Sequence, residues 1–399
     1  MNPSVAQARS QWTVRLTDLG RHTLWATFLV LLASLLVPAF GALCTLICLQ
    51  VIGLAISLAL RPKVSLFCDA PDRLVVGQEA SVRLEVRNDS TRPAYDLVCG
   101  LDSLPQTFGP TDTTRSIESL MPGQSVQWSC KLSPLRRGRH VLGGAVCRSA
   151  FPLNLVSVGR SLSTRQTLLV LPAFRDLDGF TLDRRAAHGG HRRLLGRAGV
   201  YPEYLGNRPY LPGDAPRRID ARAWARLSVP VVREFQDTGE PGVGLFLDTH
   251  LARVPGTAMT DAFEAAVSLC ASLAHSASRG CTIEWFAAGC DMHSLAEVPT
   301  GRRFDRIHDL LAEAEPAGPD QGGNPGQGLA ERSAAVSAVL FVLLSWEGPQ
   351  RQWVEQARQA GCRAIALVVA GTADTREGPE SAEVHWVSPS QAREGDVRL

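Results

Sequence analysis

The amino-acid sequence predicts a mixed fold class, α/β plus β. We expect a helical hairpin, a small antiparallel β-sandwich and a C-terminal parallel sheet flanked by helices. Three patterns support this prediction: an uncharged stretch from Thr23 to Leu60, period-two alternation after it, and alternating strand-like and helical segments in the C-terminal half. The predicted parts are a membrane anchor over residues 1–62, a β domain over 63–173, a connector over 174–242 and an α/β domain over 243–399.

Composition excludes several classes of protein. The chain has 399 residues and is 45% hydrophobic, so it is not a largely disordered protein. A net charge of +2 gives no electrostatic argument for binding nucleic acid. Lys63 and Lys131 are the only lysines, which excludes a lysine-dependent phosphate loop or Schiff base in the C-terminal half. The ten cysteines form no C-x-x-C pair and no zinc spacing, so we expect free thiols in a reducing compartment.

The uncharged N-terminal stretch is too long for one membrane span and long enough for two short ones, since one span needs about 20 residues. Pro38 and Gly41 mark a turn in its middle, which predicts two transmembrane helices at Leu24–Val37 and Leu43–Leu60. Basic residues flank both ends and place both on the cytoplasmic side: Arg9, Arg15, Arg21, Arg61 and Lys63.

The β domain is predicted from short segments of strand composition separated by Pro, Gly, Ser and Asn. Val82–Val86 alternates apolar and polar residues, as a half-buried strand does. Several such strands with turns between them are typical of a small antiparallel sandwich. The other predicted strands are Leu97–Leu101, Val126–Leu132, His140–Cys147 and Thr167–Leu171.

The C-terminal half alternates strands and helices, which predicts a parallel sheet covered on both faces. Val243–Leu247 is an apolar strand that ends on Asp248, and ligands of such sheets bind beyond the carboxyl ends of the strands. The remaining elements are helices at Thr257–Ser278, Arg302–Glu313 and Gln350–Ala360, strands at Cys281–Phe286, Val336–Leu344, Cys362–Ala370 and Val384–Val387, and a mobile loop at Ala314–Ser333.

Two parts of the connector stand out. Arg184–Arg197 is rich in Arg and His, which is typical of a solvated face. A second stretch contains a Pro-Gly turn between charges of both signs and leads into a strand-like run, Val229–Phe235. We expect Asp214 and Asp220 to pair with Arg217 or Arg226, and Arg218 to have no partner. The residues of this motif are Tyr210, Pro212, Gly213, Asp214, Arg217, Asp220 and Arg226.

This motif, Tyr-x-Pro-Gly-Asp-x-x-Arg-x-Ile-Asp followed by Ala-Arg, resembles the signature of the domain of unknown function 58 family. The family usually has Trp directly after Ile-Asp, where this chain has Ala221, and Trp224 lies three residues on. The resemblance implies a membrane-anchored bacterial protein with a von Willebrand factor A-like domain. The basic flanks of the hairpin then place the soluble part on the cytoplasmic side of the inner membrane. The resemblance also implies a protein partner, a MoxR-type AAA+ ATPase, in systems that activate or assemble other proteins.

A von Willebrand factor A domain holds its metal with the motif Asp-x-Ser-x-Ser after a strand. Here the run begins with Asp248 and Thr249, but His250 and Ala252 replace both serines. Mg²⁺ prefers oxygen ligands, so this degenerate site predicts no metal and no cofactor. We expect Asp248 to cap a neighbouring turn or helix instead.

The sequence contains no G-x-S-x-G, H-E-x-x-H, phosphate-loop or G-x-G-x-x-G motif, so we expect no enzyme and name no catalytic residue. The leading hypothesis is a membrane-tethered interaction or scaffold protein whose motif is a braced docking element. The alternatives are an adhesion module that binds an extracytoplasmic ligand, and an enzyme with an unrecognised site. Basic flanks on both ends of the hairpin and unpaired cysteines count against adhesion.

Overall fold

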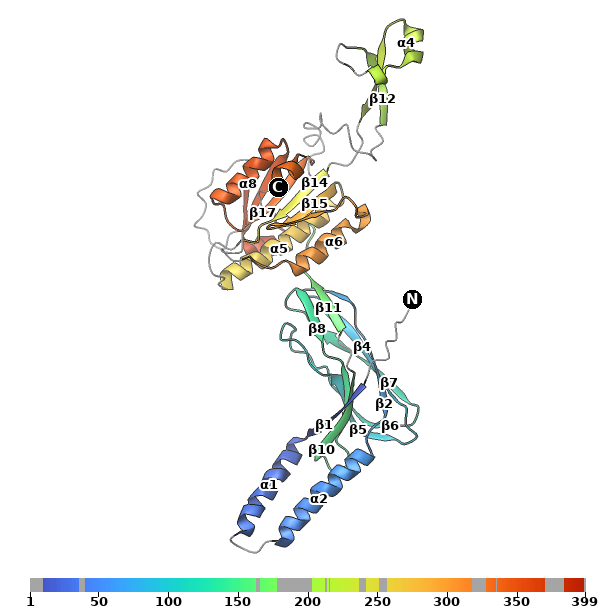
Figure 1. Cartoon of the computed structure of the whole chain (residues 1–399), viewed down its shortest axis with the longest axis vertical. Helices are drawn as coiled ribbons and strands as arrows, with labels where there is room; N and C mark the ends of the chain where they lie inside the picture. Colours follow the sequence, from blue (N-terminus) through green and yellow to red (C-terminus); the bar gives the residue numbers. More distant parts are fainter. Residues whose placement is uncertain are drawn as a thin grey trace. The chain divides into compact units, whose positions relative to one another are not determined.

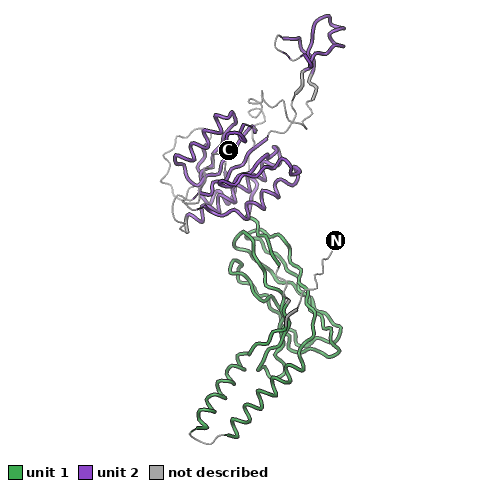
Figure 2. Tube along the Cα trace, viewed as in Figure 1, with its two compact units in different colours: residues 1–172 green, residues 173–399 purple. Residues whose placement is uncertain are grey.

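A computed structural model describes most of the chain in two compact units, Met1–Pro172 and Ala173–Leu399 (Figure 2). Within them it describes residues 10–35, 40–162, 166–177, 203–211, 214, 216–236, 242–250, 257–317, 328–334, 336–369 and 384–397. The predicted basic segment Arg184–Arg197, Pro38 of the hairpin turn and Pro212-Gly213 of the motif lie outside the described residues.

The first unit begins with a strand and two apolar helices. β1 (Ser10–Leu16) leads directly into α1 (Asp18–Ser34), whose first turn is capped by Thr17. α2 (Phe40–Ala59) returns and contains Gly41, which we had expected in the turn. Among the described helices, α2 is long and apolar enough to cross a membrane. The hairpin is therefore present, and one of its helices has the properties of a membrane span.

Three sheets form the rest of this unit around a common core. Successive side chains of a strand point to opposite faces, and in β4 (Ala80–Asn88) Val82, Leu84 and Val86 accordingly face the core, whereas the residues between them do not. The five-stranded sheet has the order β1, β10 (Val156–Leu162), β9 (Ala145–Ser149), β5 (Ala94–Leu101) and β6 (Arg115–Leu120). The second has β2 (Val64–Asp69), β4 (Ala80–Asn88) and β7 (Ser125–Leu132), and the third β3 (Arg73–Val75), β11 (Gln166–Leu171) and β8 (Gly138–Leu142).

Two features of this unit differ from the prediction. The single strand expected at His140–Cys147 is two strands, β8 and β9, in different sheets. Gly143 lies between them, where an added Cβ would come within 2.7 Å of Ser103, so the chain passes too close for a side chain. β1 was assigned to the anchor, yet it pairs antiparallel with β10 along its whole length.

The second unit is built on a six-stranded, mostly parallel sheet (Figure 1). Its order is β16 (Asp291–Ser294), β15 (Thr282–Ala288), β14 (Gly242–Leu247), β17 (Ala338–Leu343), β18 (Arg363–Val369) and β19 (Val384–Val387). Only the edge strand β16 runs antiparallel to its neighbour. The chain leaves β14 towards β15 on one side and reaches β17 on the other, so the strand order reverses beside β14.

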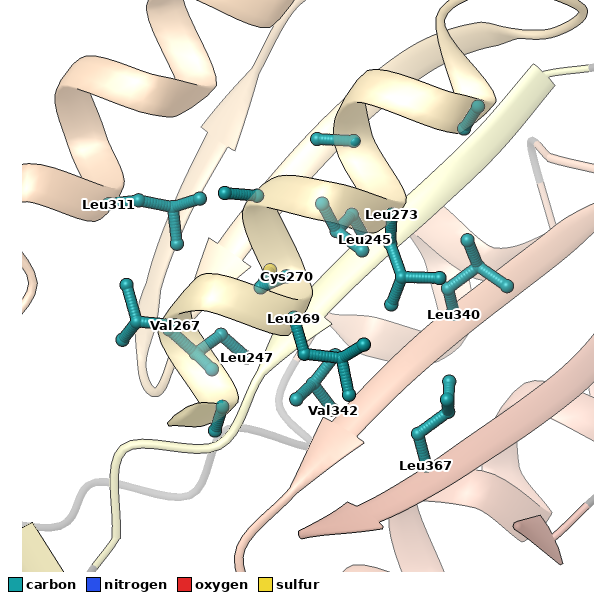
Figure 3. Close-up of a cluster of buried hydrophobic side chains, with 14 of the residues drawn as sticks. Leu245, Leu247, Val267, Leu269, Cys270, Leu273, Leu311, Leu340, Val342 and Leu367 are labelled. Atoms are coloured by element: carbon teal, nitrogen blue, oxygen red, sulfur yellow. The ribbon is translucent and has the colours of Figure 1, made fainter. Parts of the chain in front are cut away.

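Helices cover both faces, as the apolar runs of the central strands require. Leu245 and Leu247 of β14 pack under α5 (Thr257–Ala277) and α6 (Thr300–Glu313), and Phe246 faces the opposite core. Figure 3 shows the first core, with Val267 and Leu273 of α5 lying over the sheet. The other helices are α7 (Leu329–Ser333) and α8 (Gly348–Gln359) on the second face and α9 (Pro389–Glu394) beside α5.

Two stretches around this sheet also depart from the prediction. The loop expected at Ala314–Ser333 ends in helix α7, and its residues 318–327 lie outside the described part. The segment after the β domain is not all connector, because Phe174 packs against Phe304 and Leu177 is part of the core under α5. The second unit therefore starts at Ala173.

Candidate functional site

The family-like motif is carried by a small substructure of its own. β12 (Glu203–Pro209) and β13 (Val231–Gln236) pair antiparallel, and between them lie a 3₁₀ turn (Pro216–Arg218) and helix α4 (Ala221–Leu227). The backbone of Tyr210 donates to the Pro230 carbonyl at 2.9 Å, which closes the ladder at the start of the motif. The strand expected at Val229–Phe235 is β13.

Asp214 is held by a bidentate ion pair with an arginine that the sequence did not single out. Both guanidinium nitrogens of Arg208 donate to its carboxylate at 2.7 Å, and the backbone of Leu211 donates at 2.9 Å. These bonds favour the charged form and lower the pKa of Asp214 to about 2, with the charge of Arg218 adding to the effect. The predicted partners, Arg217 or Arg226, are not those in the structure.

Asp220 is the N-cap of α4. Its carboxylate accepts from the backbones of Arg222 and Ala223 at 3.0 Å each, which satisfies two of the free N–H groups that start a helix. Its other oxygen accepts from Nε of Arg233 on β13 at 3.0 Å. These hydrogen bonds lower the pKa of Asp220 to about 2. Asp220 thus joins α4 to the strand pair, again through an arginine other than the predicted ones.

The remaining arginines of the motif point to solvent. Arg217, Arg218, Arg222 and Arg226 are exposed, whereas Tyr210, Asp214 and Asp220 are half-buried. The arginines that bind the two aspartates, Arg208 and Arg233, lie on β12 and β13. The sequence analysis assigned other arginines because the pairing of these two strands arises only in the fold.

Exposed apolar side chains surround the same helix, and the sequence analysis did not single them out. We call the set of Leu211, Trp224, Leu227 and Val229 the apolar motif cluster, and each member is at least 45% exposed. Large exposed apolar groups gathered at one place are unusual on a soluble surface and typical of binding sites. The sequence feature that could have indicated this cluster is the run Ala-Arg-Ala-Trp-Ala-Arg-Leu, in which Trp and Leu occur on a helix that has no complete apolar face.

Asp248 occupies the second candidate position, at the carboxyl end of β14 where the strand order reverses. Its side chain is fully buried. One oxygen accepts from the backbone of His250 at 2.9 Å, and the other accepts from Gln350 Nε2 at 3.2 Å and from the backbone of Leu344 at 3.4 Å. Asp248 therefore braces the loop after β14 against the loop after β17 and the start of α8.

The groups around Asp248 do not form an evident metal site. His250 Nδ1 lies 3.6 Å from the Asp248 carboxylate, which raises the pKa of His250 first as a hydrogen-bond acceptor for the protonated ring and then through its negative charge. Thr249 is buried, and a Cβ added to Gly289 would lie only 2.2 Å from its hydroxyl oxygen, so these two loops are in close contact. The structure brings together no three His, Cys, Asp or Glu side chains suited to a metal within its described residues. Asp261 in α5, which also carries a carboxylate, forms an ion pair with Arg393.

Comparison with known proteins gives one informative similarity. No curated protein matches the chain. Among solved structures, the CARDB domain of a Pyrococcus furiosus protein is 13% identical over 28% of this chain and 95% of its own, with a TM-score of 0.19. An Escherichia coli alpha-2-macroglobulin fragment is 17% identical over 29% of this chain and 18% of its own, with a TM-score of 0.23. These similarities are too slight to indicate a shared fold.

The informative match covers the motif and the α/β sheet together. Residues 206–397 fit the family model described as "Protein of unknown function DUF58". That range begins within β12 and ends after α9, so it contains Asp214, Asp220 and Asp248. Through these residues, the chain belongs to the DUF58 family.

Proposed function

We propose that this protein is a membrane-anchored interaction or scaffold protein, without catalytic activity, that works with a MoxR-type AAA+ ATPase to assemble or activate other proteins. The hairpin α1–α2 spans the inner membrane of a bacterium twice, and both soluble units are cytoplasmic. The apolarity of α2 and the basic residues on both sides of the hairpin support the anchor. The pairing with an ATPase is what the resemblance to the family implies.

The observation that carries this proposal is the exposed surface of a rigidly braced motif. Asp214 fixes the turn at Leu211 to β12, and Asp220 fixes α4 to β13, so both carboxylates are already engaged by arginines of the strand pair. The exposed arginines of the motif, Arg217, Arg218, Arg222 and Arg226, can therefore form ion pairs with a partner. Trp and Arg are the residues most enriched among the energetic hot spots of protein interfaces, and this surface offers both.

The layout of α4 indicates the chemistry of the partner. Residues three or four apart lie on the same side of a helix, so Trp224 and Leu227 share one flank, and Arg222 and Arg226 share another. Ala223 is buried between them against the rest of the substructure. We infer a partner surface with an apolar pocket for Trp224 and acidic side chains beside it.

We further propose that the second unit is von Willebrand factor A-like. Its mostly parallel sheet has helices on both faces, and Asp248 follows β14 at the place where such domains begin their metal motif. In this chain Asp248 is engaged by His250, Leu344 and Gln350. We therefore assign it a structural role and assign partner binding to the motif.

Affinity purification of the full chain from detergent-extracted membranes, with and without ATP, tests the proposal. We expect a MoxR-type ATPase to be identified with the wild type and to be lost from the Trp224→Ala, Leu227→Ala double variant. Leu135→Ala is the matched control, because Leu135 is as exposed as Leu227 but belongs to the β domain. Capture of the ATPase that is equal for all three proteins contradicts the role of the motif, and no ATPase with any of them contradicts the partner.

A further inference from the structure

The loop between β9 and β10 has the composition of a membrane-contacting segment. No charged residue occurs from Ser149 to Gly159. Phe151 and Leu153 are 38% and 36% exposed, although both are large and apolar. Leu155, at the end of the loop, is buried with Val156 and Val158 in a small cluster separate from the core of the β domain.

This loop packs against both apolar helices at glycines. A Cβ added to Gly53 of α2 would lie 2.9 Å from Leu155 Cδ1 and 3.2 Å from Leu153 Cδ1. A Cβ added to Gly20 of α1 would lie 2.0 Å from the Leu155 carbonyl oxygen. The loop and the helices therefore touch without room for side chains, which fixes the position of the loop along the hairpin.

In the proposed membrane span, that position lies at the boundary between lipid headgroups and acyl chains. α2 has 20 residues, which at about 1.5 Å per residue matches the ~30 Å hydrocarbon core of a bilayer. Gly53 lies six residues before the end of α2 at Ala59, or about 9 Å along the helix. On α1, Gly20 lies next to Arg21, the last arginine before the uncharged stretch. The contact at Gly53 therefore lies on the apolar side of the headgroup region, and the contact at Gly20 lies on its charged side.

The backbone of the loop is suited to this environment, where polar groups need internal partners. Asn154 donates its N–H to the Ala150 carbonyl at 2.9 Å. The hydroxyl of Thr17 lies within hydrogen-bond reach of the carbonyls of Asn154 and Leu155, and the N–H of Thr17 donates to Leu155 at 3.3 Å. Pro152 has no N–H to satisfy.

An aromatic and cationic group lies where the helices meet the β domain. The guanidinium of Arg61 stands 5.0 Å from the centre of the Trp12 ring, and that of Arg160 stands 5.8 Å from it. Trp and Arg are enriched at the headgroup level of membranes. Trp12 lies on β1, which leads into α1, and Arg61 follows α2, so this group marks the headgroup side of the anchor.

We propose that Phe151 and Leu153 form an interfacial anchor that contacts lipid at the boundary of headgroups and acyl chains. The proposal rests on the proposed membrane anchoring by the hairpin. It adds that the β domain is seated on the bilayer by this loop rather than tethered above it by the helices alone.

Photo-cross-linking of the full chain in nanodiscs tests whether the loop contacts lipid. A benzophenone amino acid replaces, in separate proteins, Phe151, Leu49 in the apolar part of α2, and Val141 on β8. Leu49 and Val141 are 44% and 47% exposed, so the three sites are similarly accessible. β8 lies at the end of the β domain away from α1 and α2 (Figure 1).

We expect lipid cross-links at Phe151 in a yield comparable to that at Leu49, and only background at Val141. Cross-links at Leu49 with background at Phe151 overturn the interfacial anchor and leave the membrane span standing. Background at both Leu49 and Phe151 overturns the membrane span and the interfacial anchor with it. A yield at Val141 equal to that at Phe151 also overturns the proposal, because the loop then has no special contact with lipid.

Discussion

Single side chains organise the motif by making two kinds of bond at once. Asp214 accepts from a backbone N–H and from Arg208, and Asp220 accepts from the start of α4 and from Arg233. Each aspartate thereby satisfies a turn or a helix start and ties it to a strand. The sequence predicted that these acids brace the turn, but it could not provide their partners, because those depend on how β12 and β13 pair.

Acidification from about pH 4 towards pH 2 should destabilise the folded structure of this motif. Both folded-state pKa values are about 2, below the ordinary value of 3.8, so the stabilisation is complete above about pH 4 and is lost as the pH falls towards 2. Hydrogen exchange of peptides covering residues 203–236, measured relative to the intrinsic exchange rate at each pH, should therefore accelerate over this range in the wild type. An Asp214→Asn, Asp220→Asn variant should exchange faster already at pH 5 and change less on acidification. Identical pH profiles for both proteins would rule out the aspartates as the cause.

The two arginine classes of the motif should behave differently on replacement. Arg208→Ala removes both bonds of a bidentate pair and leaves Asp214 without its guanidinium partner, so exchange of the amides in β12 and around Leu211 should accelerate. Arg217→Ala removes only an exposed side chain and should leave exchange unchanged. Equal effects of the two substitutions would contradict the ion-pair assignment.

Asp248 should contribute to stability. Asp248→Ala leaves the buried amide of Gln350 and the N–H of His250 without their acceptor, which typically costs about 1–3 kcal/mol per unsatisfied group. A lowered denaturation midpoint of the second unit checks this. Asp305→Ala, an exposed carboxylate of α6, should leave the midpoint unchanged.

The same melting experiment addresses metal binding. Because His250 and Ala252 replace the hydroxyl ligands of the metal motif, we expect no saturable stabilisation of the wild type by added Mg²⁺. A saturable rise in melting temperature with Mg²⁺ that disappears in Asp248→Ala would show that this site does hold a metal.

At the scale of elements, long apolar and alternating segments were predicted well. α5, α6, α8 and the central strands β14, β17 and β18 lie where the period of their sequences places them. Short elements were missed for physical reasons. β1 has its stabilising partner, β10, far along the chain, and α4 depends on a cap and a strand pair rather than on an apolar face.

Two cysteines brought together by strand pairing test the compartment. Cys99 of β5 is directly opposite Cys147 of β9, and the sulfur atoms are 2.8 Å apart as free thiols. In an oxidising compartment this pair would form a disulfide, whereas the proposed cytoplasmic location keeps it reduced. We expect alkylation of the freshly isolated, denatured protein without reductant to modify both cysteines. A disulfide-linked peptide of Cys99 and Cys147 would contradict the cytoplasmic location.

At the scale of the whole molecule, the family region, residues 206–397, covers most of the second unit, and the first unit contains the apolar hairpin of the proposed anchor. The sequence predicted four parts from changes of hydrophobic period, and the structure divides the chain into two compact units, 1–172 and 173–399. The sequence did not predict that β1 and the loop before β10 bind the hairpin to the β domain, since neither contact leaves a local pattern. The proposed role places a partner-binding motif and a membrane anchor on one chain.

The central claim is that the motif binds an ATPase through Trp224 and Leu227 while its aspartates keep it folded. The most direct measurement is the Kd of the full chain in nanodiscs for a purified MoxR-type ATPase of the same organism, in the presence of ATP. Loss of a buried interface hot spot costs about 2 kcal/mol or more, so the Trp224→Ala, Leu227→Ala variant should bind at least about 30-fold more weakly with unchanged hydrogen exchange in its motif. An unchanged Kd for this variant would contradict the account.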